Sequence, residues 1–247
     1  MEVLPKKLDL SSRREFIKYC SLLLATSVLL KASETKFTNS KSPRYGMVID
    51  LTKCVGCQSC TMSCSMENDV PVGQFRTIVA EYEAKDSKGR GVIASLPRLC
   101  NHCEKPACIS VCPVGATYQR ANGIVKIDTN ECIGCGFCVE ACPYHARFLN
   151  KDTLKADKCT LCDHRLRAGL LPACVESCVG ASRMIGDLHD PNSSIRRFLN
   201  THDTLILSSP KNTKPQIFYY GLSEILAQNK PNSEYKMVIN WSENIIF

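Results

Sequence analysis

Short apolar segments separated by polar turns predict strands along the middle of the chain. Segment 45–51 has the apolar centre Met-Val-Ile, and segment 123–128 has a similar one, so each predicts a strand. Both lead into the pattern Cys-(Val/Ile)-Gly-Cys, which indicates an internal repeat. The glycines of this pattern, Gly56 and Gly134, allow positive φ angles and let the backbone approach a bound group closely.

The rest of the pattern predicts smaller elements. Segments 74–82 and 89–95 predict two paired strands with an exposed turn at 85–90, inside an insertion that covers residues 65–99. Segment 216–222 predicts a further strand.

Segment 192–202 predicts a helix that begins near Ser193 or Ser194. Residues 33–44 are polar and predict a linker, and residues from 223 onward carry no clear pattern.

The N-terminal segment has the order of charges and apolar residues that is typical of an export signal. Residues 12–18 read SRREFIK, and Arg13 and Arg14 form a twin-arginine pair. The apolar stretch 19–30 is too short to span a bilayer, which needs about 20 residues. We therefore predict a twin-arginine signal peptide over residues 1–32, export by the Tat translocase and a periplasmic location. The alternative is an ordinary amphipathic first helix.

Cysteine spacing is the strongest chemical signal in the chain. Sixteen of the seventeen cysteines fall into four groups, and Cys20 lies apart in the signal segment. Group 1 is Cys54, Cys57, Cys60 and Cys64; group 2 is Cys100, Cys103, Cys108 and Cys112; group 3 is Cys132, Cys135, Cys138 and Cys142; group 4 is Cys159, Cys162, Cys174 and Cys178. Groups 1 and 3 have the spacing C-x2-C-x2-C-x3-C of bacterial ferredoxins, in which the fourth cysteine ligates a neighbouring cluster. Sixteen thiolates predict four [4Fe–4S] clusters.

Other uses of these cysteines fit the spacing less well. Zinc sites need two separated pairs of ligands, which group 4 alone could supply. Disulfides are usual in exported cysteine-rich chains, but the close triples of groups 1 and 3 do not suit separate strain-free bridges. A structural zinc protein remains the alternative in a different class. Nucleic acid is not an expected partner, because the formal charge of +7 would be offset by cluster-bound thiolates.

Over well more than half its length the chain resembles the four-cluster iron–sulfur subunits of the molybdopterin oxidoreductase family, and within it the tetrathionate reductases. The resemblance is carried by residues 45–64 (YGMVIDLTKCVGCQSCTMSC), 96–103 (LPRLCNHC), 123–150, 156–186 and 218–222. It implies an α+β fold of tandem bacterial-ferredoxin-like modules over residues 45–186, with small inserted strands and a C-terminal extension at 187–247.

The resemblance also implies how cysteines of different groups combine around each cluster. Set 1 is Cys54, Cys57, Cys60 and Cys178; set 2 is Cys64, Cys159, Cys162 and Cys174; set 3 is Cys100, Cys103, Cys108 and Cys142; set 4 is Cys112, Cys132, Cys135 and Cys138. All sixteen positions are cysteine, so each set predicts a complete [4Fe–4S] cluster.

The function implied by the resemblance is electron transfer without catalysis. The partners would be a membrane subunit that oxidises quinol and anchors the chain, and a periplasmic catalytic subunit that carries molybdopterin. The alternatives of the same class are complexes that reduce thiosulfate, polysulfide or nitrite. No hydrolase, zinc-protease or dinucleotide motif occurs in the sequence.

Charged and histidine side chains near the cysteines are candidates for tuning the clusters. The cations Lys53, Arg98, Lys105, Lys158, Arg165 and Arg183 could raise reduction potentials, although solvated surface positions are the more common outcome. For His102, His145 and His164 we expect supporting or surface roles, since cysteine already completes four clusters.

Overall fold

The computed structural model describes residues 42–85, 90–207 and 211–222. The predicted signal peptide 1–32, most of the predicted linker and residues 223–247 lie outside the described residues. Within the described ranges, no helix combines the length and the apolar character needed to cross a membrane. The elements are short helices and strands, as expected for the α+β class.

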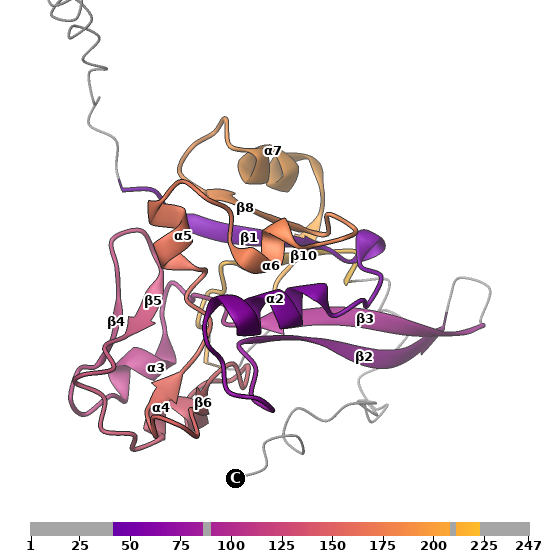
Figure 1. Ribbon diagram of the computed structural model, residues 1–247. Coiled ribbons are helices and arrows are strands. Elements are labelled where there is room, and N and C mark those ends of the chain that lie inside the picture. Colours follow the sequence, from indigo (N-terminus) through magenta and orange to yellow (C-terminus); the bar gives the residue numbers. More distant parts are fainter. Residues whose placement is uncertain (1–41, 86–89, 208–210, 223–247) are drawn as a thin grey trace, which may run out of the picture. The chain divides into compact units, whose positions relative to one another are not determined.

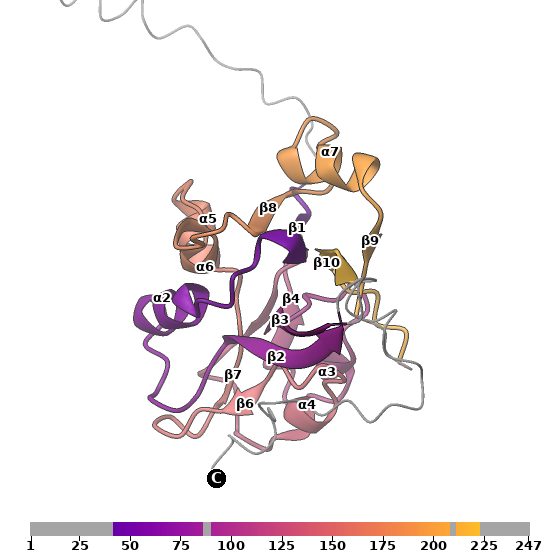
Figure 2. The ribbon, with the colours of Figure 1, turned by 90° about the vertical axis from the view of Figure 1, so that its right-hand side faces the viewer.

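A four-stranded sheet in the order β8–β1–β10–β9 organises one part of the fold; Figure 1 shows β8, β1 and β10, and Figure 2 also shows β9. Its strands are β1 (Tyr45–Asp50), β8 (Arg183–Asp187), β9 (Thr204–Leu205) and β10 (Ile217–Tyr220). β1 runs antiparallel to β8 and parallel to β10. The strands predicted at 45–51 and 216–222 are thus confirmed, and they form the buried centre of the sheet.

One helix packs on this sheet through a single buried side chain. Helix α7 (Ser194–Thr201) begins after Ser193, whose hydroxyl accepts a hydrogen bond from the Arg196 N–H at 3.2 Å. Ile195 is fully buried, and a Cβ atom on Gly186 of β8 would lie 2.6 Å from its Cγ2. The helix predicted at 192–202 is confirmed, and the missing side chain at Gly186 permits its close approach.

The insertion between groups 1 and 2 forms an antiparallel hairpin of β2 (Thr77–Lys85) and β3 (Gly91–Leu99). The predicted pairing of 74–82 with 89–95 is correct, but both strands continue further. Lys85 belongs to β2 rather than to the predicted turn, and residues 86–89 lie outside the described residues. β3 extends to Leu99 because Leu96 and Leu99 are buried in the core.

The remaining strands form two small ladders. β4 (Thr117–Gln119) pairs with β5 (Val125–Ile127), and β6 (Phe148–Leu149) pairs with β7 (Ala156–Asp157). The strand predicted at 123–128 is therefore confirmed, but it pairs with β4 rather than in the larger sheet. The predicted repeat holds for strand and loop, and the two strands differ in their partners.

Each cysteine group contributes one or more short helices. These are α2 (Ser59–Glu67), α3 (Ala107–Ser110), α4 (Phe137–Glu140), α5 (Asp163–Arg167) and α6 (Ala173–Glu176), and the 3-10 helix η1 (Leu51–Lys53) precedes group 1. α2 packs against α6, and α3 packs against α4. Figure 2 shows α2, α5 and α6 together, apart from α3 and α4. Group 1 therefore meets group 4, and group 2 meets group 3.

Candidate iron–sulfur sites

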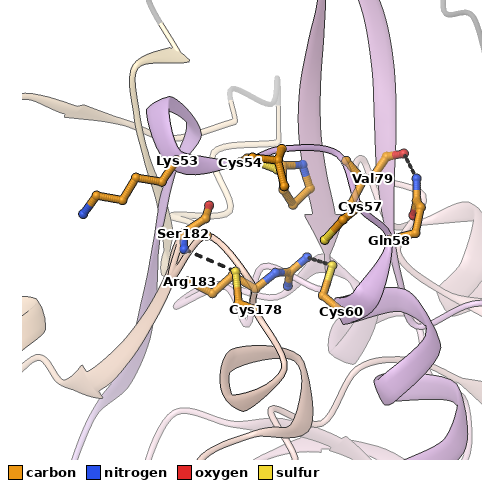
Figure 3. Close-up of a pocket in the computed structure, with 12 residues that line it drawn as sticks. Lys53, Cys54, Cys57, Gln58, Cys60, Val79, Cys178, Ser182 and Arg183 are labelled. Carbon is orange, nitrogen blue, oxygen red and sulfur yellow. Dashed lines mark hydrogen bonds between the residues drawn. The ribbon is translucent and has the colours of Figure 1, made fainter.

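The four cysteines of set 1 line one cavity, although Cys178 is far from the others in the sequence (Figure 3). Cys60 lies in α2, and Cys178 follows α6. The cavity has a volume of about 320 Å³, including the part open to solvent. The Ser182 N–H donates to the Cys178 sulfur at 3.2 Å, and the Arg183 guanidinium donates to the Cys60 sulfur at 3.3 Å. Both sulfurs are thus held as hydrogen-bond acceptors.

The loop that carries Cys54 and Cys57 curls because two of its residues have left-handed backbone angles. Gly56 has φ of 68° and Gln58 has φ of 61°. A Cβ on Gly56 would lie 2.7 Å from the Ser95 hydroxyl of β3, so the position also lacks space for a side chain. Gly134, the equivalent residue of group 3, has φ of 72° and lies directly against the Leu154 carbonyl. The positive φ expected at both glycines is confirmed.

The four cysteines of set 3 line a second cavity between groups 2 and 3, with a volume of about 330 Å³ including the part open to solvent. Val125 of β5 and the side chain of Arg147 complete its wall. Burial raises the pKa of the Cys103 thiol to about 12, and that of Cys108 to about 11. Metal binding favours the thiolate and would therefore offset the cost of ionising these buried thiols.

The cysteines of set 2 form a deeply buried cluster of sulfurs. Burial, together with the neighbouring Cys174 and Cys162 thiols, raises the pKa of Cys64 to about 12. Burial and the Cys64 thiol also raise the pKa of Cys159. The Asn68 amide lies 3.7 Å from the Cys64 sulfur and 3.8 Å from the Cys162 sulfur, so it links groups 1 and 4.

Set 4 is closer to the surface. Cys132 and Cys138 are buried in an apolar cluster with Val125, and Cys112 packs against that cluster. Burial acts to raise the pKa of Cys112, but the backbone N–H groups of Thr117 and nearby residues outweigh it and lower the pKa. Cys135 is exposed on the loop before α4. Three members of the set are therefore brought together, and the fourth lies at the solvent edge.

The donor set and its surroundings fit iron–sulfur clusters. All sixteen group cysteines are free thiols in the described residues. Two buried guanidinium nitrogens, Arg183 Nη1 and Arg147 Nη2, lack a hydrogen-bond partner among the described residues, and both side chains line the cysteine cavities. Buried donors beside thiolates match a bound anionic group.

The six cations that the sequence singled out range from exposed to fully buried residues. Lys53 is exposed and pairs with Asp50, Lys105 is exposed, and Arg165 pairs with Glu67 and Glu176. Lys158 and Arg183 are buried beside cysteines, so the surface interpretation is wrong for these two.

The remaining side chains near the cysteines include two that sequence reasoning missed. Arg98 is partly buried and donates to the Tyr144 carbonyl. Arg147 and Asn68 were not predicted, because neither stands at a diagnostic spacing from the cysteines.

The histidines take supporting positions. His102 is fully buried, and its Nδ1 accepts the Val125 N–H at 3.0 Å. Burial, with Lys158 and Arg147 nearby, lowers the pKa of His102 well below its usual range. His164 hydrogen-bonds to Glu67 at 2.7 Å, and His145 is exposed. These positions agree with the roles expected from the sequence.

Comparisons with known proteins agree with this chemistry. Two models of a 4Fe-4S dicluster domain match residues 53–116 and 92–188. A tetrathionate reductase subunit of Salmonella typhimurium is 51% identical over 87% of this chain and 90% of its own. A tetrathionate reductase subunit of Archaeoglobus fulgidus is 44% identical over 74% of this chain and 84% of its own. The thiosulfate reductase electron transfer subunit PhsB of Salmonella typhi is 43% identical over 65% of this chain and 84% of its own.

Proposed function

Because the chain belongs to the family of iron–sulfur subunits of the molybdopterin oxidoreductases, in which it is a non-catalytic electron-transfer subunit, we propose that it serves a tetrathionate reductase. It would relay electrons through four [4Fe–4S] clusters from a membrane subunit that oxidises quinol to a molybdopterin catalytic subunit. The observation that supports this most strongly is that thiols from distant segments surround shared cavities.

We assign the ligands by set. Set 1 is Cys54, Cys57, Cys60 and Cys178; set 2 is Cys64, Cys159, Cys162 and Cys174; set 3 is Cys100, Cys103, Cys108 and Cys142; set 4 is Cys112, Cys132, Cys135 and Cys138. Sets 1 and 3 each line one cavity, and set 2 shares buried neighbours, which supports the exchange of ligands between groups.

The elements support a linear order of the sets from 1 to 4. Helix α2 carries Cys60 of set 1 and Cys64 of set 2 one turn apart. The Cys100 thiol of set 3 is among the neighbours that raise the pKa of Cys159 in set 2, after burial and the Cys64 thiol. Cys108 of set 3 packs in the same apolar cluster as Cys138 of set 4. When bound, each cluster would accept and release one electron at a time.

Both ends of this order lie at exposed apolar surface. At set 1, Cys57 is exposed beside Val55 and Val179, which are 68% and 73% exposed. At set 4, Cys135 is exposed beside Ile133 and Phe137, which are 60% and 59% exposed. We call these the set 1 surface and the set 4 surface. Exposed apolar patches of this kind commonly form protein interfaces, so each would dock one partner subunit.

The overall reaction balances with two electrons. Quinol would lose two electrons and two protons to become quinone at the membrane subunit. Tetrathionate would gain the two electrons at the catalytic subunit, where its central S–S bond breaks to give two thiosulfate ions. The chain itself would transfer electrons only.

Reconstitution tests this function. The purified chain alone should accept electrons from dithionite but reduce no sulfur oxyanion at a useful rate. Tetrathionate reduction should require the molybdopterin subunit, and quinol should drive it only with the membrane subunit present. Rapid reduction by the chain alone would contradict the proposal.

If the complete complex preferred thiosulfate, polysulfide or nitrite, the relay would remain and the substrate assignment would fall. The thiosulfate reductase relative makes that second candidate worth measuring in the same assay.

The location is proposed from the sequence alone. Arg13 and Arg14 support export by the Tat translocase to the periplasm, with the membrane subunit as anchor. Replacing both by lysine should retain the loaded protein in the cytoplasm, and undiminished export would contradict this route.

A further inference from the structure

We propose that three buried cations, Arg183, Lys158 and Arg147, each lie between two neighbouring cluster sites and raise the reduction potentials of both. The inference rests on the proposed function, because it requires clusters bound by sets 1 to 4. It assigns to each cation a pair of sites: Arg183 to sets 1 and 2, Lys158 to sets 2 and 3, and Arg147 to sets 3 and 4.

The burial of these cations sets them apart from the other lysine and arginine residues that the structure describes. Arg147 and Lys158 are 1% exposed, and Arg183 is 4% exposed. In the described part of the chain, no carboxylate forms an ion pair with any of the three. A buried charge without a counter-ion is strongly unfavourable, so the fold must supply negative charge by another route. Cluster-bound thiolates are the nearest candidates.

Arg183 contacts a cysteine of set 1 directly, and Cys174 of set 2 packs in the same core cluster as that cysteine, Cys60. Its side chain lines the set 1 cavity, and its Nη2 donates to the Cys60 sulfur at 3.3 Å and to the Thr77 hydroxyl at 3.0 Å (Figure 3). Burial lowers the pKa of Arg183. The Cys174 thiol of set 2 and the Cys60 thiol of set 1 raise it by more than burial lowers it, so the net shift is upward. Its Nη1 is one of the buried donors without a partner among the described residues.

Lys158 joins the two halves of the fold. It precedes Cys159 of set 2, and its ammonium donates to the Cys159 carbonyl at 2.8 Å and to the Val125 carbonyl. Val125 lines the set 3 cavity. Burial lowers the pKa of Lys158, and the thiols of Cys100 in set 3 and Cys159 in set 2 oppose that shift only in part, so the net shift is downward. The ammonium thus lies within electrostatic reach of both sites.

Arg147 occupies the equivalent position at the other end. Its side chain lines the set 3 cavity, and its Nη1 donates to the Thr117 hydroxyl at 3.2 Å. Burial lowers the pKa of Arg147, but the Cys108 thiol of set 3, followed by Cys100 and Cys138, raises it more. Cys138 belongs to set 4, and Thr117 follows Ala116, which packs in the apolar cluster of Cys132 and Cys138. Arg147 Nη2 lacks a partner among the described residues.

The expected effect follows from electrostatics. Four thiolates leave a [4Fe–4S] site with net negative charge, which grows when an electron arrives. A buried cation between two such sites stabilises the reduced form of each, and weak screening in the interior preserves the interaction. Removing the cation should therefore lower two potentials at once.

Redox titration of the loaded chain, followed by EPR, tests this assignment. Lys158→Met, Arg183→Gln and Arg147→Gln should each shift the reduction equilibrium of two clusters at least tenfold, or about 59 mV for a one-electron couple. The Arg183 and Lys158 variants should share one shifted cluster, as should the Lys158 and Arg147 variants. The Arg183 and Arg147 variants should share none.

Arg196→Gln is the matched control. Arg196 is an exposed residue of α7 and lines neither of the two cysteine cavities. Its removal should leave all potentials unchanged. The proposal is overturned if Lys158→Met loads fully and moves no potential, or if Arg196→Gln moves them equally.

A variant that fails to bind its full complement of iron also tests the proposal. Iron loss in Arg183→Gln that is rescued in Arg183→Lys supports a requirement for positive charge, and loss in both variants overturns it. The iron content of the unmodified chain tests the proposed function separately, so the two failures are distinguishable.

Discussion

At the scale of single residues, ionising the buried cysteine thiols carries an electrostatic cost that a bound cluster would offset. Burial raises the pKa of Cys64 and Cys103 to about 12, and neighbouring cysteine thiols add to both shifts. Iron binding requires the thiolate, so cluster insertion and the burial of these residues are thermodynamically coupled.

Cys178→Ser tests the exchange of ligands between groups. It should disrupt the cluster bound by Cys54, Cys57 and Cys60, because the Cys178 sulfur lies in their cavity. We expect the loss of up to about four iron atoms per chain, or a changed EPR signal of one cluster. Cys20→Ser, outside the four groups, should leave iron content unchanged. A defect confined to the cluster of Cys159 and Cys162 would contradict the assignment.

The spacing of cysteines in the sequence predicts which thiols are ligands, but it does not predict which other side chains lie beside them. The four groups were recognisable because iron–sulfur ligands keep fixed local separations. The burial of Lys158 and Arg147 could not be predicted from the sequence. Lys158 directly precedes a cysteine, as the exposed Lys53 does, and Arg147 stands at no diagnostic spacing from the cysteines. Their burial depends on how β5 and the cysteine loops pack, which no local pattern records.

At the scale of elements, short loops and helices position the thiols. The pairs α2–α6 and α3–α4 bring distant groups together, and the hairpin of β2 and β3 covers the first of these regions through buried Val79 and Leu96. Strand segments were predictable from their apolar runs. The pairing of β1 with β8 and β10 was not, because it joins segments far apart in the sequence.

Gly134→Ala tests the loop geometry at set 4. A Cβ there would collide with the Leu154 carbonyl, in addition to the cost of a positive φ, which is about 1–2 kcal/mol. We expect loss of one cluster, measured by iron content and EPR. Gly73→Ala is the matched control, since Gly73 has φ of 86° and open space around its Cα. Equal effects of both variants would show that backbone strain alone decides.

At the scale of the whole molecule, a chain that passes electrons from one partner to another needs two separate docking surfaces. The set 1 surface and the set 4 surface lie at opposite ends of the proposed order of clusters. Sequence predicted the need for two partners only through family resemblance. The exposed apolar residues that could contact them became visible only in the folded chain.

Charge substitutions at the two surfaces should separate the partners. Val179→Asp and Phe137→Asp should each weaken one partner at least tenfold, or about 1.4 kcal/mol, and leave the other unaffected. Pull-down of each subunit with the loaded chain measures this. Val72→Asp is the control, because Val72 is 90% exposed and lies in the insertion. Loss of the same partner from both variants would contradict the arrangement.

All sixteen group cysteines should together bind four complete clusters. Iron and acid-labile sulfide are measured per chain after anaerobic reconstitution. We expect about sixteen of each, since every [4Fe–4S] cluster contributes four. A value near eight, or zinc in place of iron, would overturn the assignment of four clusters.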